Sequence, residues 1–128
     1  MNEMETSLDM TKPQFEAFMA LSIDKSVQML NLLKFRDGLD EKGLTGEENY
    51  DAYSAAAFPF LKAANAKIIY YGKAQLTLIG PESEWDKVLI IEYPSKLDFL
   101  NMIKSEGYPA KLRKAALIDS RLILCARL

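Results

Sequence analysis

The chain has 128 residues, the length of a single domain that can bury a sizeable core without disulfides. Hydrophobic residues make up 49% of the chain and charged residues 27%, and 16 Lys and Arg stand against 18 Asp and Glu, a net charge of -2. This near balance of charges provides no positive field that would attract nucleic acid or anionic membranes. No apolar stretch approaches the ~20 residues of a membrane span, so we expect neither nucleic acid nor a membrane as a partner.

The N-terminus is expected to be a tail over residues 1–10, followed by a single domain over residues 11–128. It is acidic and has no apolar segment of the kind that a signal peptide contains, which favours a cytoplasmic protein. Thr11 and Gln14 have the spacing of a helix capping box, and apolar residues follow at helical intervals. The sequence therefore predicts a short helix over about 12–22.

Four segments rich in aliphatic and aromatic residues are typical of β-strands. They span residues 27–35, 67–78, 85–93 and 121–128. The first, third and fourth are apolar at both alternating positions, which indicates strands that are covered on both faces. Gly72 lies within the second segment and predicts a bulge or a close backbone approach. Turn residues 80–84 join the second and third strands as a hairpin.

A long helix is expected between the first two strands. Thr45 begins a second capping box, and the helix runs over about 47–64 with apolar residues along one face. Pro59 lies inside this pattern and predicts a kink or a short break. Two shorter helices, over about 96–105 and 110–117, are expected between the last two strands.

After the N-terminal helix, the element order is β-α-β-β-α-β, which is the pattern of an α+β, ferredoxin-like fold. Right-handed crossovers place the helices on one face of an antiparallel sheet, with the expected strand order 4-1-3-2. One face would then stay uncovered, although three strands are apolar on both sides. We expect a second copy of the chain to cover it around a two-fold axis, giving a homodimer. The alternative is that the N-terminal helix folds beneath the sheet.

Several short motifs in the chain occur in the order found in a known family. They are Met29 to Phe35, the Tyr50-x-x-Tyr53 pair, Gly80, Trp85 to Val88, Glu92 to Ser95, and Phe99, Met102, Ser105, Tyr108 and Arg113. Over residues 24–128 the sequence resembles the domain of unknown function 1330 family, within the dimeric α/β-barrel superfamily. The resemblance implies a ferredoxin-like fold whose sheets pair into a barrel across a dimer. The superfamily includes cofactor-free monooxygenases, haem-dependent enzymes, muconolactone isomerases and stress-response proteins, but the family itself has no established activity.

The chain contains no histidine, which is a frequent catalytic or haem-ligating residue elsewhere in that superfamily. Its absence removes the commonest general base and the commonest metal ligand, and Cys125 is the single cysteine. We therefore expect no metal site, no intramolecular disulfide and no bound cofactor. Because Cys125 lies within an apolar strand, we expect it to be an inert, buried thiol.

Three residues are candidates for direct chemistry. Asn31 lies between apolar strand residues, so its amide either orients a ligand or is satisfied by backbone or buried water. Glu92 ends an apolar run; burial in a cavity would raise its pKa and make it a candidate base, whereas the alternative is a strand-end carboxylate paired with Arg121 or Arg127. Tyr53 is a candidate for moving protons, although its place on the apolar helix face favours a core role.

Arg113 and Trp85 complete the expected ligand pocket, together with Asn31 and Tyr53. The guanidinium of Arg113 matches a carboxylate in bidentate geometry, and the alternative is a salt bridge that holds the chain down. Trp85 and the tyrosines suit a small aromatic ligand and suit core packing equally well.

These observations favour a homodimeric protein that binds a small molecule, either between sheet and helices or inside the dimer barrel. The alternative is a cofactor-independent, monooxygenase- or isomerase-like enzyme acting on a small aromatic or unsaturated acid. A third hypothesis is a dimer whose partner is another protein. The sequence shows neither a nucleophile–base pair nor a phosphate-binding glycine loop, so the choice between enzyme and binding protein stays open.

Overall fold

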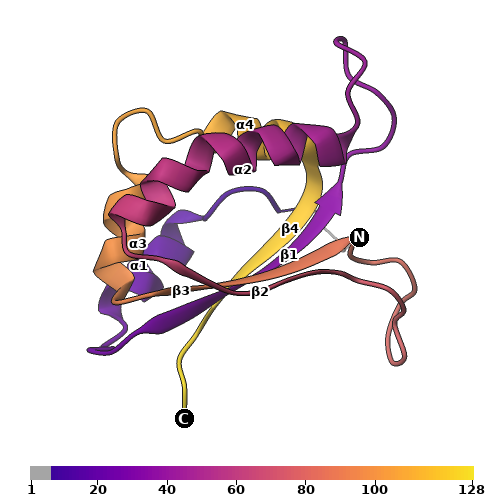
Figure 1. Ribbon diagram of the computed structural model, residues 1–128. Helices are drawn as coiled ribbons and strands as arrows, with labels where there is room; N and C mark the ends of the chain where they lie inside the picture. Colours follow the sequence, from indigo (N-terminus) through magenta and orange to yellow (C-terminus); the bar gives the residue numbers. More distant parts are fainter. Residues whose placement is uncertain (1–6) are drawn as a thin grey trace.

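A computed structural model describes residues 7–128 of the chain. Its elements follow one another as α1 Lys12–Ala20, β1 Val27–Phe35, α2 Gly46–Ala63, β2 Lys67–Lys73, β3 Lys87–Tyr93, α3 Lys96–Ile103, α4 Ala110–Ala116 and β4 Leu117–Cys125. The strands form one antiparallel sheet in the order β2-β3-β1-β4, as the sequence predicts. α2 and α4 lie side by side across one face of the sheet, and α3 lies at one end (Figure 1). This is an α+β, ferredoxin-like fold.

Side-chain caps explain where the helices begin. Thr11 accepts a hydrogen bond from the backbone N–H of Gln14 at the start of α1, and Thr45 accepts one from Glu48 at the start of α2. In both cases the side chain of the third helical residue, Gln14 or Glu48, accepts a hydrogen bond from the backbone N–H of the capping threonine. Both predicted capping boxes are therefore confirmed. Ser95 caps α3 in the same way, without the return bond.

β2 is shorter than the sequence predicts, and the expected second half of the strand is a loop. β3 begins at Lys87, which pairs with Lys73, and after one further backbone hydrogen bond, from Ala74 N–H to the carbonyl oxygen of Asp86, the chain leaves the sheet. The register shift in this pair lies between Ile68 and Tyr70 and not at Gly72. At Gly72 the neighbour is a side chain and not another backbone, because a Cβ there would collide with the ring and hydroxyl of Tyr70.

Two other elements also differ from expectation. β4 begins at Leu117, directly after α4, rather than at residue 121. Its early residues include Asp119 and Ser120, which are typical of turns but here bond to another part of the chain. α2 runs without a break through Pro59, so the expected break is wrong. A proline removes one helical hydrogen bond, and burial of the apolar side of α2 holds the helix across that position.

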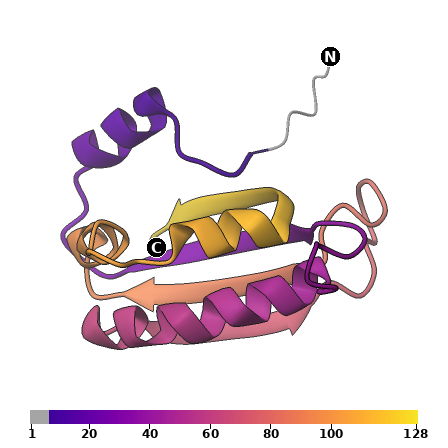
Figure 2. The same cartoon turned by 90° about the horizontal axis from the view of Figure 1, so that it is seen from above.

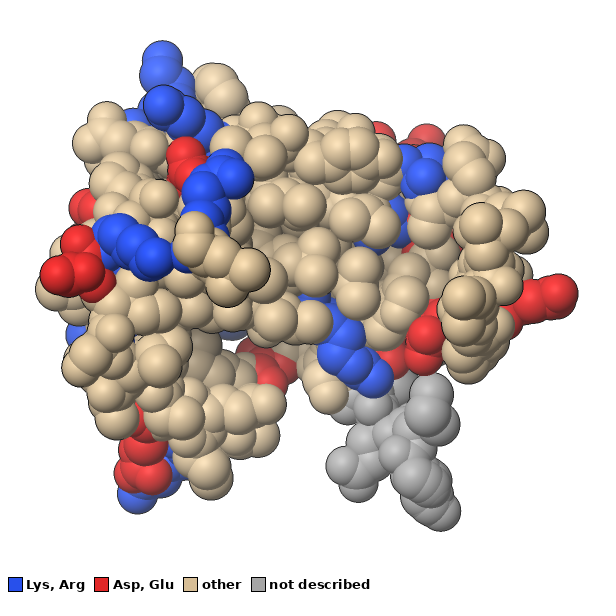
Figure 3. All heavy atoms as spheres, turned by 90° about the horizontal axis from the view of Figure 1, so that it is seen from below, with Lys and Arg blue, Asp and Glu red and all other residues tan. Residues whose placement is uncertain are grey.

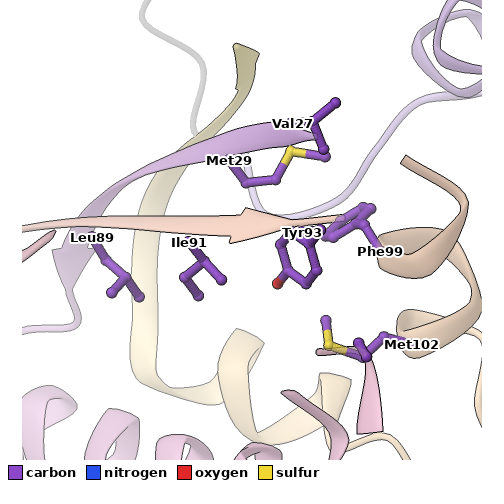
Figure 4. Close-up of a cluster of buried hydrophobic side chains, with 8 residues drawn as sticks. Val27, Met29, Leu89, Ile91, Tyr93, Phe99 and Met102 are labelled. Carbon is purple, nitrogen blue, oxygen red and sulfur yellow. The ribbon is translucent and has the colours of Figure 1, made fainter. Parts of the chain in front are cut away.

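The hydrophobic core lies between the sheet and the helices and has two adjoining parts. The first joins β1 and β3 to α3 through side chains that Figure 4 shows, among them Met29, Leu89, Ile91, Tyr93, Phe99 and Met102. The second centres on Leu33, which is fully buried against Tyr50 and Ala57 of α2 and Leu117 of β4. These contacts fix the positions of α2 and α4 above the sheet.

The opposite face of the sheet carries no helix within the described residues. Because side chains alternate along a strand, Leu30 and Leu32 of β1 and Val88 and Ile90 of β3 point toward this face, where they are half-buried. Figure 3 looks onto this side of the molecule and shows a broad uncharged area, with most charged side chains toward its margins. The expected uncovered apolar face is therefore present in the single chain.

The N-terminal segment is bound to β4. The backbone N–H of Ser7 donates to Asp119 Oδ1 at 2.8 Å, and the hydroxyl of Ser120 donates to the carbonyl oxygen of Ser7 at 2.7 Å. Ser7 of the expected tail is therefore hydrogen-bonded to β4. Residues 1–6 of that expected tail lie outside the described residues.

α1 packs against α3 rather than beneath the sheet. The rings of Phe18 and Phe99 meet edge to face with centroids 6.2 Å apart. The ammonium group of Lys96 donates to the backbone carbonyl oxygens of Phe18, Met19 and Leu21 at the end of α1. Figure 2 shows α1 standing apart from α2 and α4, beyond β4. The alternative in which this helix covers the free face of the sheet is therefore wrong.

Candidate functional site

A cavity of about 1080 Å3 lies between the helix-bearing face of the sheet and the helices. Most of its lining from the sheet and α3 is apolar, with Met29, Leu89, Ile91, Phe99, Met102 and Leu122. In Figure 4 the side chains of Leu89, Ile91 and Tyr93 project from the same side of β3 toward the helices. Residues of the N-terminal segment and α1 close a further side. The volume and the apolar walls match those of small-molecule sites.

Tyrosine hydroxyls from three elements gather in this cavity. Tyr50 and Tyr53 come from α2, Tyr93 from β3, and Tyr108 from the turn before α4. The hydroxyls of Tyr53 and Tyr108 are hydrogen-bonded to each other, and the rings of Tyr50 and Tyr53 lie 5.2 Å apart. Burial, reinforced by the neighbouring Tyr53, raises the pKa of Tyr50, Tyr93 and Tyr108 well above the ordinary value. These three phenols therefore stay protonated at neutral pH.

Arg113 projects from α4 into the same lining. Its Nη2 atom is buried and has no hydrogen-bond partner among residues 7–128. None of the salt bridges between described residues involves Arg113, so the structural role considered for it, a bridge that holds the chain down, is not found there. Burial raises the pKa of Tyr50 and Tyr108, and the positive charge of Arg113 acts in the opposite direction and lowers it. The guanidinium therefore interacts with the tyrosine cluster. A buried, unsatisfied donor is costly, and a ligand acceptor would satisfy it.

Asn31 lies on β1 among the apolar residues of the cavity and is only 7% exposed. Its Nδ2 atom donates to the carbonyl oxygens of Met29 and Leu89 at 3.4 and 3.5 Å, at the long end of the hydrogen-bond range. The backbone alternative for Asn31 is therefore met only by long hydrogen bonds, and its role in orienting a ligand stays a prediction. The amide has backbone partners, and they are weak enough for a ligand acceptor to compete with them.

Glu92 lies outside the cavity lining and does not have the raised pKa expected of a buried base. Gln28 Nε2 donates to its carboxylate at 2.6 Å, and Arg127 lies 3.4 Å away. The hydrogen bond from Gln28 and then the charge of Arg127 hold the pKa of Glu92 below its ordinary value. Of its two alternatives, the structure shows the strand-end carboxylate paired with Arg127.

Trp85 is also absent from the cavity lining, although we expected it in the pocket. The indole ring lies just before β3 and stacks beneath the guanidinium of Arg121, 5.0 Å from its centroid. Arg121 in turn bonds Asp119 at 2.7 Å. Trp85 therefore packs on Arg121, a lining residue, without lining the cavity itself.

Cys125 is exposed at the end of β4, so the expectation of a buried thiol is wrong. Within residues 7–128 no group of three or more Cys, Asp or Glu side chains is arranged to hold a metal ion. In the same part of the chain, no helix has the length and apolar character needed to cross a membrane.

The cavity also contains residues that the sequence reasoning did not place in the pocket. Tyr50 lies one helical turn before Tyr53, and this spacing was a signal that both face the same way. Tyr108 joins them only because the chain returns across α2 before α4 begins. Leu8 and Asp9 of the N-terminal segment line the cavity too, and nothing in their local sequence distinguishes them.

Known proteins with similar sequences and structures agree with this fold. The model of a family described as a domain of unknown function, DUF1330, matches residues 41–126. A protein of unknown function from Rhodopseudomonas palustris, RPA0582, has 38% sequence identity and a TM-score of 0.88, over 97% of this chain and 98% of that chain. The methylated form of RPA0582 superposes with a TM-score of 0.86 at 37% identity, over 98% and 97% of the two chains.

A more distant structural relative is a protein of unknown function from Bacteroides fragilis, described as dimeric and ferredoxin-like. It is 14% identical, with a TM-score of 0.52 over 77% of this chain and 93% of that chain, a likeness that concerns the fold alone. No functionally curated protein matches the sequence. The family model covers most of the chain, and the RPA0582 structures match nearly all of it. The chain therefore belongs to the DUF1330 family.

Proposed function

We propose that this chain is a homodimeric small-molecule-binding protein whose ligand occupies the cavity between the sheet and the helices. The observation that carries the proposal is the cavity itself. It combines apolar walls with a group of inward-facing polar atoms from Asn31, Tyr50, Tyr108 and Arg113. A few polar groups converging in an apolar space are what fix the orientation of a bound small molecule.

The second candidate is a cofactor-independent enzyme acting on a small aromatic or unsaturated acid in the same cavity. The hydrogen-bonded Tyr53–Tyr108 pair favours it, because a phenol can donate a proton to a bound substrate. Tyr108 with a raised pKa is a poor base at neutral pH, however, and Glu92 lies outside the cavity. The geometry provides donors that hold an anion better than it provides a base that removes a proton, so we favour binding.

The homodimer rests on the helix-free face of the sheet. Leu30, Leu32, Val88 and Ile90 form its centre, and Tyr70 of β2 is 51% exposed beside Ile90. An apolar surface of this kind, continuous over several strands, exceeds what single chains usually leave in water. A second copy presents the same apolar face, so packing face to face around a two-fold axis would bury both. The two sheets would then form the barrel that the resemblance to dimeric proteins implies.

The ligand proposal is tested by a thermal-shift screen of the purified protein against small aromatic acids, quinones and haem. Asn31→Ala and Arg113→Ala should reduce the shift that a true ligand produces, because both remove donors from the cavity. Lys111→Ala is the matched control, since Lys111 is exposed on the same helix as Arg113 and lies outside the lining. If both cavity variants keep every ligand-induced shift of the wild type, the cavity is not the binding site.

The dimer is tested by native mass spectrometry and sedimentation. The wild type should have the mass of two chains, and Ile90→Asp should have the mass of one, since a carboxylate cannot be buried unpaired between two sheets. Leu39→Asp is the control, because Leu39 is an exposed loop residue, 68% accessible to solvent. A wild type that stays a single chain at micromolar concentration would refute the homodimer.

A further inference from the structure

The positive charges among the side chains that line the cavity are not all neutralised by protein carboxylates. They are Asp9, Arg113, Lys114 and Arg121. Asp9 is paired with Lys114 at 3.1 Å, and Arg121 is paired with Asp119 at 2.7 Å. Arg113 has no carboxylate partner among the described residues. Within the described part of the chain, the lining therefore carries one positive charge that no protein group neutralises.

The environment of Arg113 fits a single planar anion. Its buried Nη2 atom lacks a hydrogen-bond partner within residues 7–128, and a guanidinium presents parallel N–H groups that match the two oxygens of a carboxylate. Tyr50 and Tyr108 bring protonated hydroxyls to the same cavity, so an anion at Arg113 would find neutral donors beside the charge. No second free cation joins Arg113 in the described lining, as the dianion of a phosphate ester would require.

The rest of the cavity excludes a small, fully hydrated anion. Apart from the paired charges and a few polar side chains, its walls are aliphatic and aromatic, with Met29, Ile91, Phe99 and Leu122 among them. Filling this space with apolar groups releases water from apolar surface, which is favourable in proportion to the area covered. A molecule with one charged end and an apolar body satisfies both parts of the cavity at once.

We propose that the ligand is a small organic monocarboxylate, with its carboxylate on Arg113 and its apolar body against the sheet. This inference rests on the proposed binding function of the same cavity, and it adds the charge and the orientation of the ligand. The guanidinium group is a permanently charged partner for a carboxylate. Binding should therefore follow the ionisation of the ligand and weaken as the pH falls below the pKa of its carboxyl group.

The test compares acids with amides of the same shape. Phenylacetate and hexanoate are titrated against phenylacetamide and hexanamide by protein-detected NMR, with inorganic phosphate as a dianion probe. Each acid should bind at least tenfold more tightly than its amide, and phosphate should not displace it. Amides that bind as tightly as acids would overturn the carboxylate inference and leave the cavity proposal intact. If neither series perturbs the cavity residues, both the inference and the proposed function fail.

Two substitutions of Arg113 test whether the carboxylate of the ligand binds to this residue. Arg113→Gln should remove the preference for acids over amides, and Arg113→Lys should keep part of the preference because it keeps the charge without the planar fork. Lys111→Gln should behave as the wild type. Backbone NMR signals of Arg113→Gln that match those of the wild type away from the cavity show that the variant is folded. An acid preference that survives Arg113→Gln, or one that is lost in Lys111→Gln, would refute the assignment.

Discussion

Gly46→Ala should destabilise the protein even though alanine is the better helix former. Gly46 is the first residue of α2 and is buried where the end of β1 meets the end of α4. A Cβ at this position would lie 2.7 Å from both the backbone nitrogen and the backbone oxygen of Arg36, and 2.8 Å from the carbonyl oxygen of Ala116. All three atoms belong to the backbone, so no side chain can rotate away.

The expected magnitude follows from two opposing terms. Replacing glycine by alanine inside a helix gains up to about 1 kcal/mol. Overpacking a site whose neighbours cannot relax typically costs about 1–3 kcal/mol. Since the new methyl group would press on the hydrogen bond between Arg36 N–H and Ala116 C=O, we place Gly46→Ala at the upper end of that range. The net loss in the free energy of unfolding is then about 1–2 kcal/mol.

Urea denaturation measures the loss, and hydrogen exchange locates it, because the amide of Arg36 should lose protection first. Asp51→Ala, on the exposed side of the same helix, is the control and should stay within about 0.5 kcal/mol of the wild type. A Gly46→Ala protein as stable as the wild type, with the Arg36 amide still protected, would show that the backbone where β1, α2 and α4 meet can shift at little cost to admit a methyl group. The close-packing argument would then be refuted.

Three further substitutions test other parts of the structure. Lys96→Met removes the ammonium group that donates to three carbonyl oxygens at the end of α1. Because α1 buries no residue, its amides should exchange faster while the free energy of unfolding falls by less than ~1 kcal/mol, and unchanged exchange would contradict a role of Lys96 in holding α1. Burial alone would raise the pKa of Asp119, but hydrogen bonds from two backbone N–H groups and a guanidinium outweigh it, so the folded pKa lies below the ordinary 3.8. Asp119 then stabilises the fold above that ordinary value and loses its effect as pH falls through the folded pKa. The stability gap between wild type and Asp119→Asn should therefore hold from pH 7 down to the ordinary 3.8 and narrow as the pH falls further, whereas a gap that stays constant in stronger acid would count against it. Tyr108→Phe removes the hydroxyl partner of Tyr53 and should cost about 1 kcal/mol in urea denaturation; no loss would mean that water replaces the bond.

The sheet was predictable because its strands are defined by local pattern. β1 runs over Val27–Phe35, the range that the apolar run indicates, and the observed strand order follows from right-handed crossovers. The ends of β2 and β4 were not predictable in the same way. β2 stops where β3 ceases to pair with it, and β4 starts early because Leu117 and Asp119 pair with the end of β1, while Ser7 bonds the side chains of Asp119 and Ser120. Both boundaries depend on partners distant in the sequence.

The candidate site was also predictable only in part. Asn31, Tyr53 and Arg113, all expected in the pocket, line the cavity, and their role in binding stays a prediction. Glu92 does not line it, and the reason is strand register. Asn31 pairs with Leu89 on the face toward the helices, whereas Glu92 pairs with Gln28 on the other face. With both faces apolar, the sequence carried no signal for which alternation points inward.

One wall of the cavity depends less on the packed core than the others do. The segment from Ser7 to Leu21 contributes lining residues, yet α1 buries no residue of its own. Replacing lining residues of this segment should therefore leave the packed sheet undisturbed. Such substitutions offer a way to change which molecules fit while the scaffold that presents Arg113 stays the same.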